Sequence, residues 1–390
     1  MRIVIFTNSY KPTISGVVRS IDVFRKGLIA AGHEVCVITP EREDYEDEEP
    51  YIFRFPALEL PERLDLSLVI PLKTPMAATV RGIKPALIHS QHPFVMGGLA
   101  SAFARDLKLP LIFTFHTRYD AYAKQYIPLM PALAGMLTTE IVKRYLEKCT
   151  IVIAPTPSIR DLILREYGAD VPVVIVPTPV DLNTYHDLEP DRIRAKLNLE
   201  EAEILLYVGR LVGEKNLDLL LRAFAIIAPR RPQARLLMVG DGTHRQYLEN
   251  MAKDLGLGER VIFPGAIPQC EVPHYDAAAD LFVFPSLTDT QGLVLIEAMA
   301  AGTPVVAVEA PGPMDVLAEG GGVLAPPREE AFAEAMLRFL ADDSRRRALE
   351  AQASRAAQRY SIPYATERLL AVYEAAIAAG PIGDEKRSAS

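Results

Sequence analysis

The sequence predicts an α/β protein of two Rossmann-like domains, whose parallel sheets face each other across a cleft. Three observations lead to this prediction. The chain has 390 residues, a length that suits two domains of ordinary size. Short apolar segments alternate with helical patterns throughout the sequence. A Pro-rich stretch, Pro177-Thr178-Pro179-Val180-Asp181, divides these segments into two sets.

The apolar segments are rich in β-branched residues and end at polar, Gly or Pro residues. Nearly continuous apolar segments of this kind are typical of parallel strands that are buried on both faces. Their alternation with helical patterns predicts doubly wound domains. The segments are Ile3–Phe6, Val35–Thr39, Ala86–His89, Leu111–Phe115, Ile151–Ala154 and Val173–Val176 in the first half, then Ile204–Val208, Arg235–Val239, Val261–Phe263, Leu281–Phe284, Pro304–Val308 and Gly322–Leu324 in the second.

The Pro-rich stretch is the predicted boundary between the domains. We expect residues 1–177 to form the first domain and residues 178–362 the second. Ligands of doubly wound sheets bind outside the carboxyl ends of the strands, so the residues that follow each strand are the candidates for chemistry. We interpret the acidic segment Glu41–Glu49 as a solvated loop.

Composition narrows the function classes. The chain is 49% hydrophobic with a formal net charge of -8, which disfavours a nucleic-acid role. The acidic excess lies entirely after Asp181, which leaves a neutral first half. The three cysteines lack the spacing of metal ligands, a pattern that fits a reducing cytosol. We see no signal peptide and no apolar stretch long enough to span a bilayer.

A polar loop follows the first predicted strand and leads into a helix. The helix begins near Ser15-Gly16-Val17-Val18, and its free amides can hold a phosphate or sugar oxygen. Gly16 permits close backbone approach to a ligand. The loop lacks the Gly-x-Gly-x-x-Gly pattern, so the nicotinamide fingerprint is absent and an oxidoreductase is disfavoured. A plain structural turn explains the same residues.

Basic and imidazole side chains follow other predicted strands. Arg210 lies at the carboxyl end of the first strand of the second domain, and Lys215 opens the next helix. Two cations there can neutralise a leaving diphosphate, although an ordinary solvated pair is the alternative. His116 follows a strand of the first domain, at the edge expected to face the cleft. A structural histidine is the alternative there.

The most informative stretch follows the predicted strand Leu281–Phe284. A polar loop contains Asp289, and a helix runs from near Gly292 to Gly302. The first amides of that helix can meet an anion. Glu297 lies within the helix among apolar residues, so it is expected to be buried with a partner rather than solvated. Carboxylates at 289 and 297 can accept paired hydrogen bonds from the vicinal diols of a sugar and a ribose.

Over essentially its whole length, the chain resembles the family 4 retaining glycosyltransferases, which have the GT-B fold. The family pattern Glu-x7-Glu occurs here with Asp289 in the first position, which keeps the charge and shortens the reach. Within the family, the chain is most similar to the diacylglycerol α-glucosyltransferases. The motifs that carry the resemblance are Gly209-Arg210-x4-Lys215, Val239-Gly240-Asp241-Gly242, Asp289-x7-Glu297 with Ala298–Val306, Ser15–Ser20, Phe115–Tyr119 and Thr290-Gln291-Gly292.

The resemblance implies donor-binding roles for the second domain. Arg210 and Lys215 would bind the donor diphosphate, and Glu297 would hold the ribose. Asp289 would grip the donor sugar, helped by the backbone of Gln291, Gly292 and Leu293.

The resemblance also implies roles in the first domain. Gly16 would lie beside the donor phosphate, and His116 beside the transferred sugar. His116 would thus share catalysis with Arg210, Lys215 and Asp289. The closing helical segment, residues 363–390, would pack back onto the first domain.

The resemblance further implies retaining transfer of a hexose, glucose from UDP-glucose, onto a lipid acceptor such as 1,2-diacylglycerol. We expect neither cofactor nor metal, because the chain contains no Asp-x-Asp pattern. A transferase with a soluble or polysaccharide acceptor and a nucleotide-sugar epimerase of the same fold are the alternatives. Detection of sugar transfer to any acceptor would exclude the epimerase.

One segment bears on a membrane acceptor. Ile127–Leu137 is apolar, too short to span a bilayer and long enough for an interfacial element. Lys143, Arg144 and Lys148 follow it, and cations beside an apolar patch favour anionic lipid surfaces. A core helix with a solvated basic end is the alternative. With the resemblance, the segment predicts a cytoplasmic protein that binds peripherally to the inner face of the cell membrane.

Overall fold

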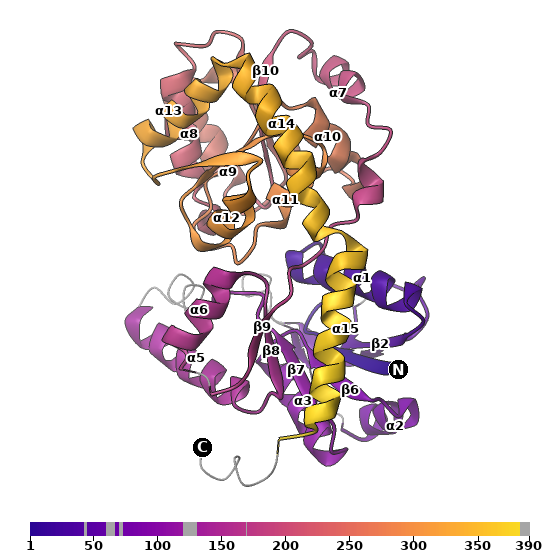
Figure 1. Ribbon diagram of the computed structural model, residues 1–390. Coiled ribbons are helices and arrows are strands. Elements are labelled where there is room, and N and C mark those ends of the chain that lie inside the picture. Colours follow the sequence, from indigo (N-terminus) through magenta and orange to yellow (C-terminus); the bar gives the residue numbers. More distant parts are fainter. Residues whose placement is uncertain (43–44, 60–66, 70–72, 120–130, 169, 383–390) are drawn as a thin grey trace. The chain divides into compact units, whose positions relative to one another are not determined.

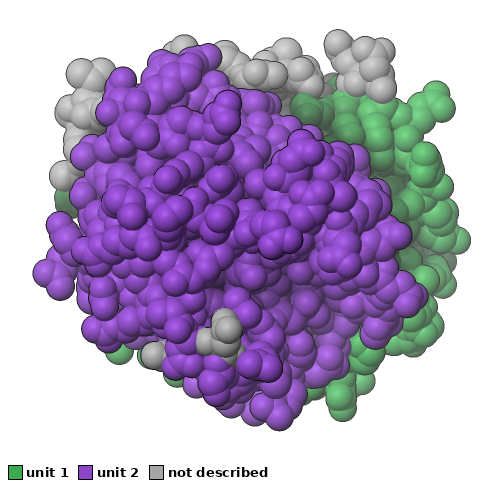
Figure 2. All heavy atoms as spheres, turned by 90° about the horizontal axis from the view of Figure 1, so that it is seen from above, with its two compact units in different colours: residues 1–179, 362–390 green, residues 180–361 purple. Residues whose placement is uncertain are grey.

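The computed structural model describes residues 1–42, 45–59, 67–69, 73–119, 131–168 and 170–382. The chain divides into two compact units, which Figure 2 shows in different colours. Unit 1 comprises Met1–Pro179 and Ile362–Ser390, and unit 2 comprises Val180–Ser361. Each unit has a parallel sheet with helices, so the prediction of an α/β protein with two Rossmann-like domains is confirmed.

The sheet of unit 1 has, within the described residues, seven parallel strands in the order β3-β2-β1-β6-β7-β8-β9. The chain order reverses between β1 and β6, which is the switch point where doubly wound sheets bind ligands. The strands are β1 (Arg2–Phe6), β2 (Glu34–Pro40), β3 (Ile52–Phe55), β6 (Leu87–Ser90), β7 (Leu111–Thr114), β8 (Ile151–Ala154) and β9 (Val173–Ile175). A small antiparallel pair, β4 (Ala57–Glu59) and β5 (Ser67–Val69), completes the strands described in unit 1.

Helices cover both faces of this sheet because successive side chains of a strand point to opposite faces. Ile3 and Ile5 of β1 pack with helix α1, while Val4 and Phe6 pack on the other face. Ser15 caps α1 by accepting a hydrogen bond from the amide of Val18 at 3.2 Å. The helices are α1 (Gly16–Ala30), α2 (Lys73–Ile83), α3 (Val95–Asp106), α5 (Pro131–Leu146), α6 (Pro157–Glu166) and α15 (Ile362–Ala379).

Helix α15 belongs to unit 1 although it follows the whole of unit 2 in the sequence. Figure 1 shows it in yellow alongside α1. Thr366 fits against Gly27 of α1 so closely that a Cβ at Gly27 would lie 2.0 Å from its Oγ1. Tyr373 is fully buried, and its hydroxyl lies 2.8 Å from Nδ1 of His89. Helix α15 thus completes the apolar core on the α1 face of the sheet.

The acidic segment before β3 was interpreted as a solvated loop, but two of its carboxylates form ion pairs within unit 1. Glu49 forms ion pairs with Lys11 at 2.6 Å and with the buried Arg25 at 2.7 Å. Asp47 pairs with Arg54 of β3, also at 2.7 Å. The segment therefore holds the edge of the sheet and the loop before Gly16 through contacts between residues far apart in sequence.

The sheet of unit 2 has six parallel strands in the order β12-β11-β10-β13-β14-β15, among the residues described. Its switch point lies between β10 and β13. Each of the apolar segments predicted in both halves of the chain corresponds to one of these strands or to one in unit 1. The strands are β10 (Glu203–Val208), β11 (Ala234–Val239), β12 (Val261–Gly265), β13 (Leu281–Phe284), β14 (Val305–Val308) and β15 (Gly322–Ala325).

Helices pack on both faces of this sheet around one apolar core. The α-helices are α7 (Pro190–Leu197), α8 (Leu217–Ile227), α9 (Arg245–Asp254), α10 (Val272–Ala278), α11 (Leu293–Ala300), α12 (Pro311–Val316), α13 (Glu329–Leu340) and α14 (Asp343–Ala357). The 3-10 helices are η2 (Leu182–Tyr185), η3 (Gly213–Lys215), η4 (Gly258–Arg260), η5 (Gln269–Glu271), η6 (Leu317–Glu319) and η7 (Gln358–Tyr360).

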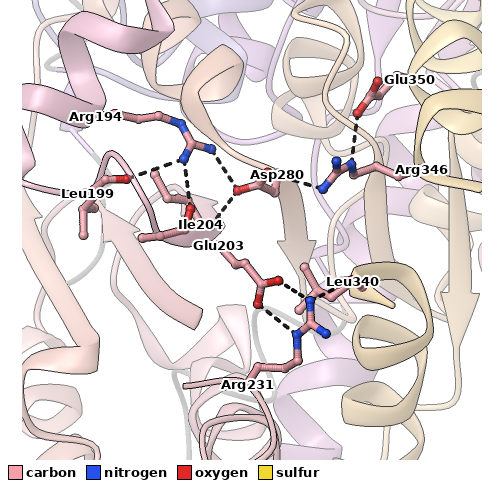
Figure 3. Close-up of polar contacts among 10 residues, drawn as sticks. Arg194, Leu199, Glu203, Ile204, Arg231, Asp280, Leu340, Arg346 and Glu350 are labelled. Carbon is pink, nitrogen blue, oxygen red and sulfur yellow. Dashed lines mark hydrogen bonds and ion pairs between the residues drawn. The ribbon is translucent and has the colours of Figure 1, made fainter. Parts of the chain in front are cut away.

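Ionic contacts fasten the amino ends of the strands in unit 2 (Figure 3). Asp280, just before β13, accepts hydrogen bonds from Arg194 and from the amide of Ile204, both at 2.8 Å. Glu203 at the start of β10 accepts from Nε of Arg231 at 2.9 Å. These contacts lie at the edge opposite the switch-point ligand edge, so we assign them to the fold rather than to the site.

Candidate active site

The predicted site residues of unit 2 follow β10 and β13, the two strands on either side of its switch point. Arg210 and Lys215 lie in the connection from β10 to α8, and Asp289 lies in the connection from β13 to α11. The sequence predicted that Lys215 would open the helix after β10. In the structure Lys215 is instead the last residue of the 3-10 helix η3, which precedes α8. The sheet therefore brings the two connections together.

The Gly-Asp-Gly motif after β11 packs against the connection that holds Arg210. A Cβ at Gly240 would lie 1.9 Å from the carbonyl oxygen of Gly209, and one at Gly242 would lie 2.4 Å from that of Leu211. Both glycines have positive φ angles, 136° and 159°. The amide of Leu211 donates to Asp241 O at 2.8 Å. The motif therefore fixes the backbone on which Arg210 stands.

Lys215 and Asp289 form a direct ion pair. Nζ of Lys215 lies 2.8 Å from Oδ1 and 2.9 Å from Oδ2 of Asp289. Their side chains are 17% and 21% exposed. The pair stands at the ligand-binding edge of the sheet and is shielded from most of the surrounding water.

Two opposing effects set the pKa of Asp289. Burial favours the neutral carboxyl, but the charge and hydrogen bonds of Lys215 outweigh it, so the pKa lies below its ordinary value. Ser286 and Arg210 lower the pKa further. Asp289 is therefore a carboxylate at neutral pH and can only accept hydrogen bonds.

Glu214 joins the site, although the sequence did not single it out. Its side chain is only 7% exposed, and its Oε1 accepts a hydrogen bond from Arg210 at 2.6 Å. The spacing of four residues between Arg210 and Glu214 was the available signal, but it predicts an ion pair only on a helix. The carboxylate holds a guanidinium that is itself 45% exposed.

Two further residues join the connections after β10 and β13. Nδ2 of Asn216 donates to the carbonyl oxygen of Pro285 at 3.1 Å, and Thr288 Oγ1 donates to that of Glu214 at 3.3 Å. Asn216 has a left-handed conformation with φ 54°, which asparagine tolerates better than most residues. These contacts fix Lys215 relative to Asp289.

Helix α11 presents the remaining predicted donor-binding residues. Gly292 precedes it with φ 79°, and Leu293 is its first residue. Gln291 is buried beside them. A Cβ at Gly312 of α12 would lie 3.0 Å from the amide nitrogen of Gln291, so α12 supports this loop closely. Glu297 is 2% exposed within this apolar helix.

In unit 1, the predicted site residues follow β1 and β7. Gly16 is the first residue of α1 and is exposed, with open space where a side chain would stand. His116 lies two residues beyond β7 and is half-buried. Its Nε2 lies 2.6 Å from Oε1 of Gln91, which follows β6 and was not predicted from the sequence. How Gly16 and His116 serve a ligand stays a prediction.

Three histidines of unit 1 are neutral at physiological pH. Burial lowers the pKa of His89 to about 3 and that of His92 to about 4. Burial lowers the pKa of His116 to about 3, and repulsion by His92 and His89 adds to the effect. At neutral pH, His116 can therefore donate one hydrogen bond and accept another, but it carries no charge.

We expect acid to destabilise unit 1 through these histidines. Between pH 6.5 and about 3, an unfolded histidine binds a proton while His89 does not, so the free energy of unfolding falls as the pH falls. One such group contributes up to about 1.4 kcal/mol per pH unit. Urea unfolding at pH 6 and pH 5 should show this dependence, and H89Q should reduce the slope by about that amount. An unchanged slope in H89Q would contradict the assignment.

The fold and the site together define a class of protein. Two Rossmann-like units, with cations and carboxylates at the switch point of the second, are the features of a GT-B glycosyltransferase. Residues 14–184 match the family Glycosyltransferase Family 4, and residues 189–356 match Glycosyl transferases group 1. The chain belongs to the family 4 glycosyltransferases, as its motifs predicted.

Relatives similar to this chain in sequence include two alpha-monoglucosyldiacylglycerol synthases. The alpha-monoglucosyldiacylglycerol synthase of Streptococcus pneumoniae is 33% identical over 79% of this chain and 71% of its own length. That of Acholeplasma laidlawii is 31% identical over 78% and 80%. A GDP-mannose-dependent alpha-mannosyltransferase of Corynebacterium glutamicum is 30% identical over 82% and 75%.

Solved structures agree on the fold. Sucrose-phosphate synthase of Thermosynechococcus elongatus superposes with a TM-score of 0.81 and 25% identity, covering 97% of this chain and 99% of that one. HepE of Anabaena, in complex with UDP-glucose, has a TM-score of 0.75 and 18% identity, with 96% and 100% covered. The second likeness concerns the fold alone.

Proposed function

We propose that this enzyme is a retaining hexosyltransferase that moves glucose from UDP-glucose onto a diacylglycerol at an anionic membrane surface. The observation that carries the proposal is the similarity to two alpha-monoglucosyldiacylglycerol synthases over more than two thirds of their length. The site in unit 2 supports a nucleotide-sugar donor through its cations, and the surface of α5 supports a lipid acceptor.

In this proposal, the donor diphosphate meets Arg210 and Lys215. As the glycosidic bond breaks, negative charge develops on the leaving phosphate, and positioned cations stabilise it. Asp289 and the loop at 291–293 contact the sugar, and Glu297 contacts the ribose. Gly16 lies beside the donor phosphate and His116 beside the transferred sugar. The leaving phosphate assists deprotonation of the acceptor on the same face, which retains the anomeric configuration.

The acceptor surface is assigned to helix α5. Met136, Leu137 and Ile141 are 71%, 57% and 52% exposed on this helix. Arg144 on the same helix and Lys148 just beyond it are also exposed. Exposed apolar side chains with nearby cations favour anionic lipid. Part of the predicted interfacial segment, residues 127–130, lies outside the described residues.

A further finding concerns membrane insertion. Across the described residues, no helix combines the length and apolar character that crossing a bilayer requires. We propose peripheral binding on the cytoplasmic side, through the surface of α5.

The proposal is tested with a panel of radiolabelled donors and acceptors. UDP-glucose and GDP-mannose are each offered with diacylglycerol in anionic vesicles and with soluble acceptors, including inositol phosphate. We expect glucosyl transfer to diacylglycerol to exceed every other combination. GDP-mannose is included because one relative of similar identity is named for it. Transfer only to soluble acceptors would overturn the lipid proposal, and hydrolysis or epimerisation without transfer would overturn the transferase.

Membrane binding should depend on the exposed apolar residues of α5. The triple variant in which serine replaces Met136, Leu137 and Ile141 should cosediment with anionic vesicles at low salt at least tenfold less than the wild type, because apolar burial drives interfacial binding. Ile377 on α15 is 41% exposed, so I377S is a matched control and should bind like the wild type. Equal binding of the triple variant would contradict the assignment of this surface.

Metal independence is a separate prediction. If Arg210 and Lys215 meet the diphosphate charge, transfer in excess EDTA should stay within about twofold of the untreated rate. The assay compares freshly desalted enzyme with and without chelator, then with added magnesium or manganese. Loss of transfer in chelator with full recovery on metal addition would show that a cation shares this role.

A further inference from the structure

We infer that Gln91 is a positioning residue that fixes the tautomer and ring orientation of His116. The inference rests on the proposed function only in assigning His116 a place beside the transferred sugar. Oε1 of Gln91 and Nε2 of His116 are 2.6 Å apart, a short hydrogen bond between neutral groups. A carbonyl oxygen can only accept, so Nε2 of His116 is the protonated nitrogen.

The position of Gln91 is fixed by its surroundings. It follows β6 and is 3% exposed. Its amide donates to the carbonyl oxygen of Phe6 at 2.9 Å, which ties its backbone to the end of β1. The next turn is held as well, since Oγ of the buried Ser90 donates to His92 O at 2.8 Å. A buried side chain on a tethered backbone is a suitable reference for a neighbouring ring.

The backbone on the His116 side is equally constrained. The preceding Phe115 is fully buried, and its amide donates to the carbonyl oxygen of Ile153 at 2.9 Å. Its ring packs edge-to-face with Tyr119 at 5.4 Å and with Tyr167 at 5.3 Å between centroids. The backbone is therefore fixed at both strands, and the hydrogen bond to Gln91 orients the imidazole itself.

The tautomer has a chemical consequence. A neutral imidazole that is protonated at Nε2 carries its lone pair on Nδ1, which only accepts hydrogen bonds. At Nδ1 such a ring offers an acceptor to a hydroxyl group and no donor to a carboxylate. Gln91 therefore sets which kind of group His116 can contact, and removing its side-chain amide should lower the rate of transfer.

The first test reads the tautomer without any substrate. Protein labelled with 15N-histidine should show the Nε2–H tautomer for His116 at pH 7.5, with the signal assigned by its loss in H116A. In Gln91→Leu the ring should populate the Nδ1–H tautomer as well. An Nδ1–H tautomer in the wild type, or an unchanged spectrum in Gln91→Leu, would overturn the inference whatever the enzyme transfers.

The second test is a double-mutant cycle on glucosyl transfer. Gln91→Leu should lower kcat/KM about tenfold in the wild-type background, mainly through kcat, and should have no further effect in H116A. Gln246 is exposed on α9, so Gln246→Leu is a matched control. An equal loss in both backgrounds would show that Gln91 acts independently of His116. If the wild type transfers no sugar but the tautomer is as expected, only the proposed function fails.

Discussion

Replacing Lys215 by alanine should lower kcat/KM for sugar transfer by about 10²- to 10³-fold. A preorganised donor that meets developing charge is typically worth ~2.7–4 kcal/mol in the transition state. The ammonium of Lys215 lies within 3 Å of both Asp289 oxygens and at the switch point of the sheet, where we propose that the donor diphosphate binds. Steady-state kinetics with radiolabelled donor and saturating acceptor measure the effect.

Two further variants make the Lys215 result interpretable. Lys215→Met keeps an unbranched apolar side chain without the charge, so it should lose activity like the alanine variant while keeping the fold. Lys253 is exposed on α9, and its alanine variant should retain wild-type activity. Near wild-type kcat/KM in Lys215→Met would count against the role of the charge.

Replacing Glu297 by glutamine should weaken binding of UDP by about 10- to 100-fold. Hydrogen bonds to a charged group contribute about 1.5–3 kcal/mol, and the amide keeps the size while removing the charge. Glu297 is 2% exposed on α11, so the substitution acts at a buried site and changes little volume. Titration calorimetry with UDP, which has no sugar, isolates the expected ribose contact from any sugar contact.

Thermal unfolding separates this effect from damage to the fold. Glu297→Gln should unfold within a few degrees of the wild type, and its glucosyl transfer should recover at high UDP-glucose if only binding has changed. The exposed Glu259 gives a control, Glu259→Gln, with unchanged UDP affinity. Wild-type affinity for UDP in Glu297→Gln would exclude a ribose contact.

Much of the fold could be predicted because parallel strands buried on both faces leave continuous apolar segments. Ile204–Val208 and Leu281–Phe284 are examples, and both are strands in the structure. Strand β3 was missed: Ile52–Phe55 contains Arg54, whose charge interrupts the apolar pattern. Arg54 is accommodated there by Asp47, a contact that no local pattern reveals.

The positions of the candidate site residues in the fold could be predicted, but their contacts could not. The strand ends located Arg210, Lys215 and Asp289, because the topology of a doubly wound sheet gathers its carboxyl ends on one edge. The ion pair between Lys215 and Asp289 joins residues 74 positions apart, so only the folded sheet shows it. Gln91 left no signal in the sequence for the same reason. It follows β6, whereas His116, the residue that it contacts, follows β7.

The position of α15 in unit 1 has a consequence for folding during synthesis on the ribosome. Unit 2 is continuous in sequence, whereas the core of unit 1 lacks Leu369, Val372, Tyr373 and Ala376 until α15 has been synthesised. Domains generally fold in the order of their synthesis. Here unit 2 can complete its folding first. Until α15 is available, the apolar face of α1 and the neighbouring face of the unit 1 sheet stay exposed to solvent. Premature termination before Ile362 would thus release a chain prone to aggregation. Chaperones would bind mainly to the exposed apolar surface of the amino-terminal unit.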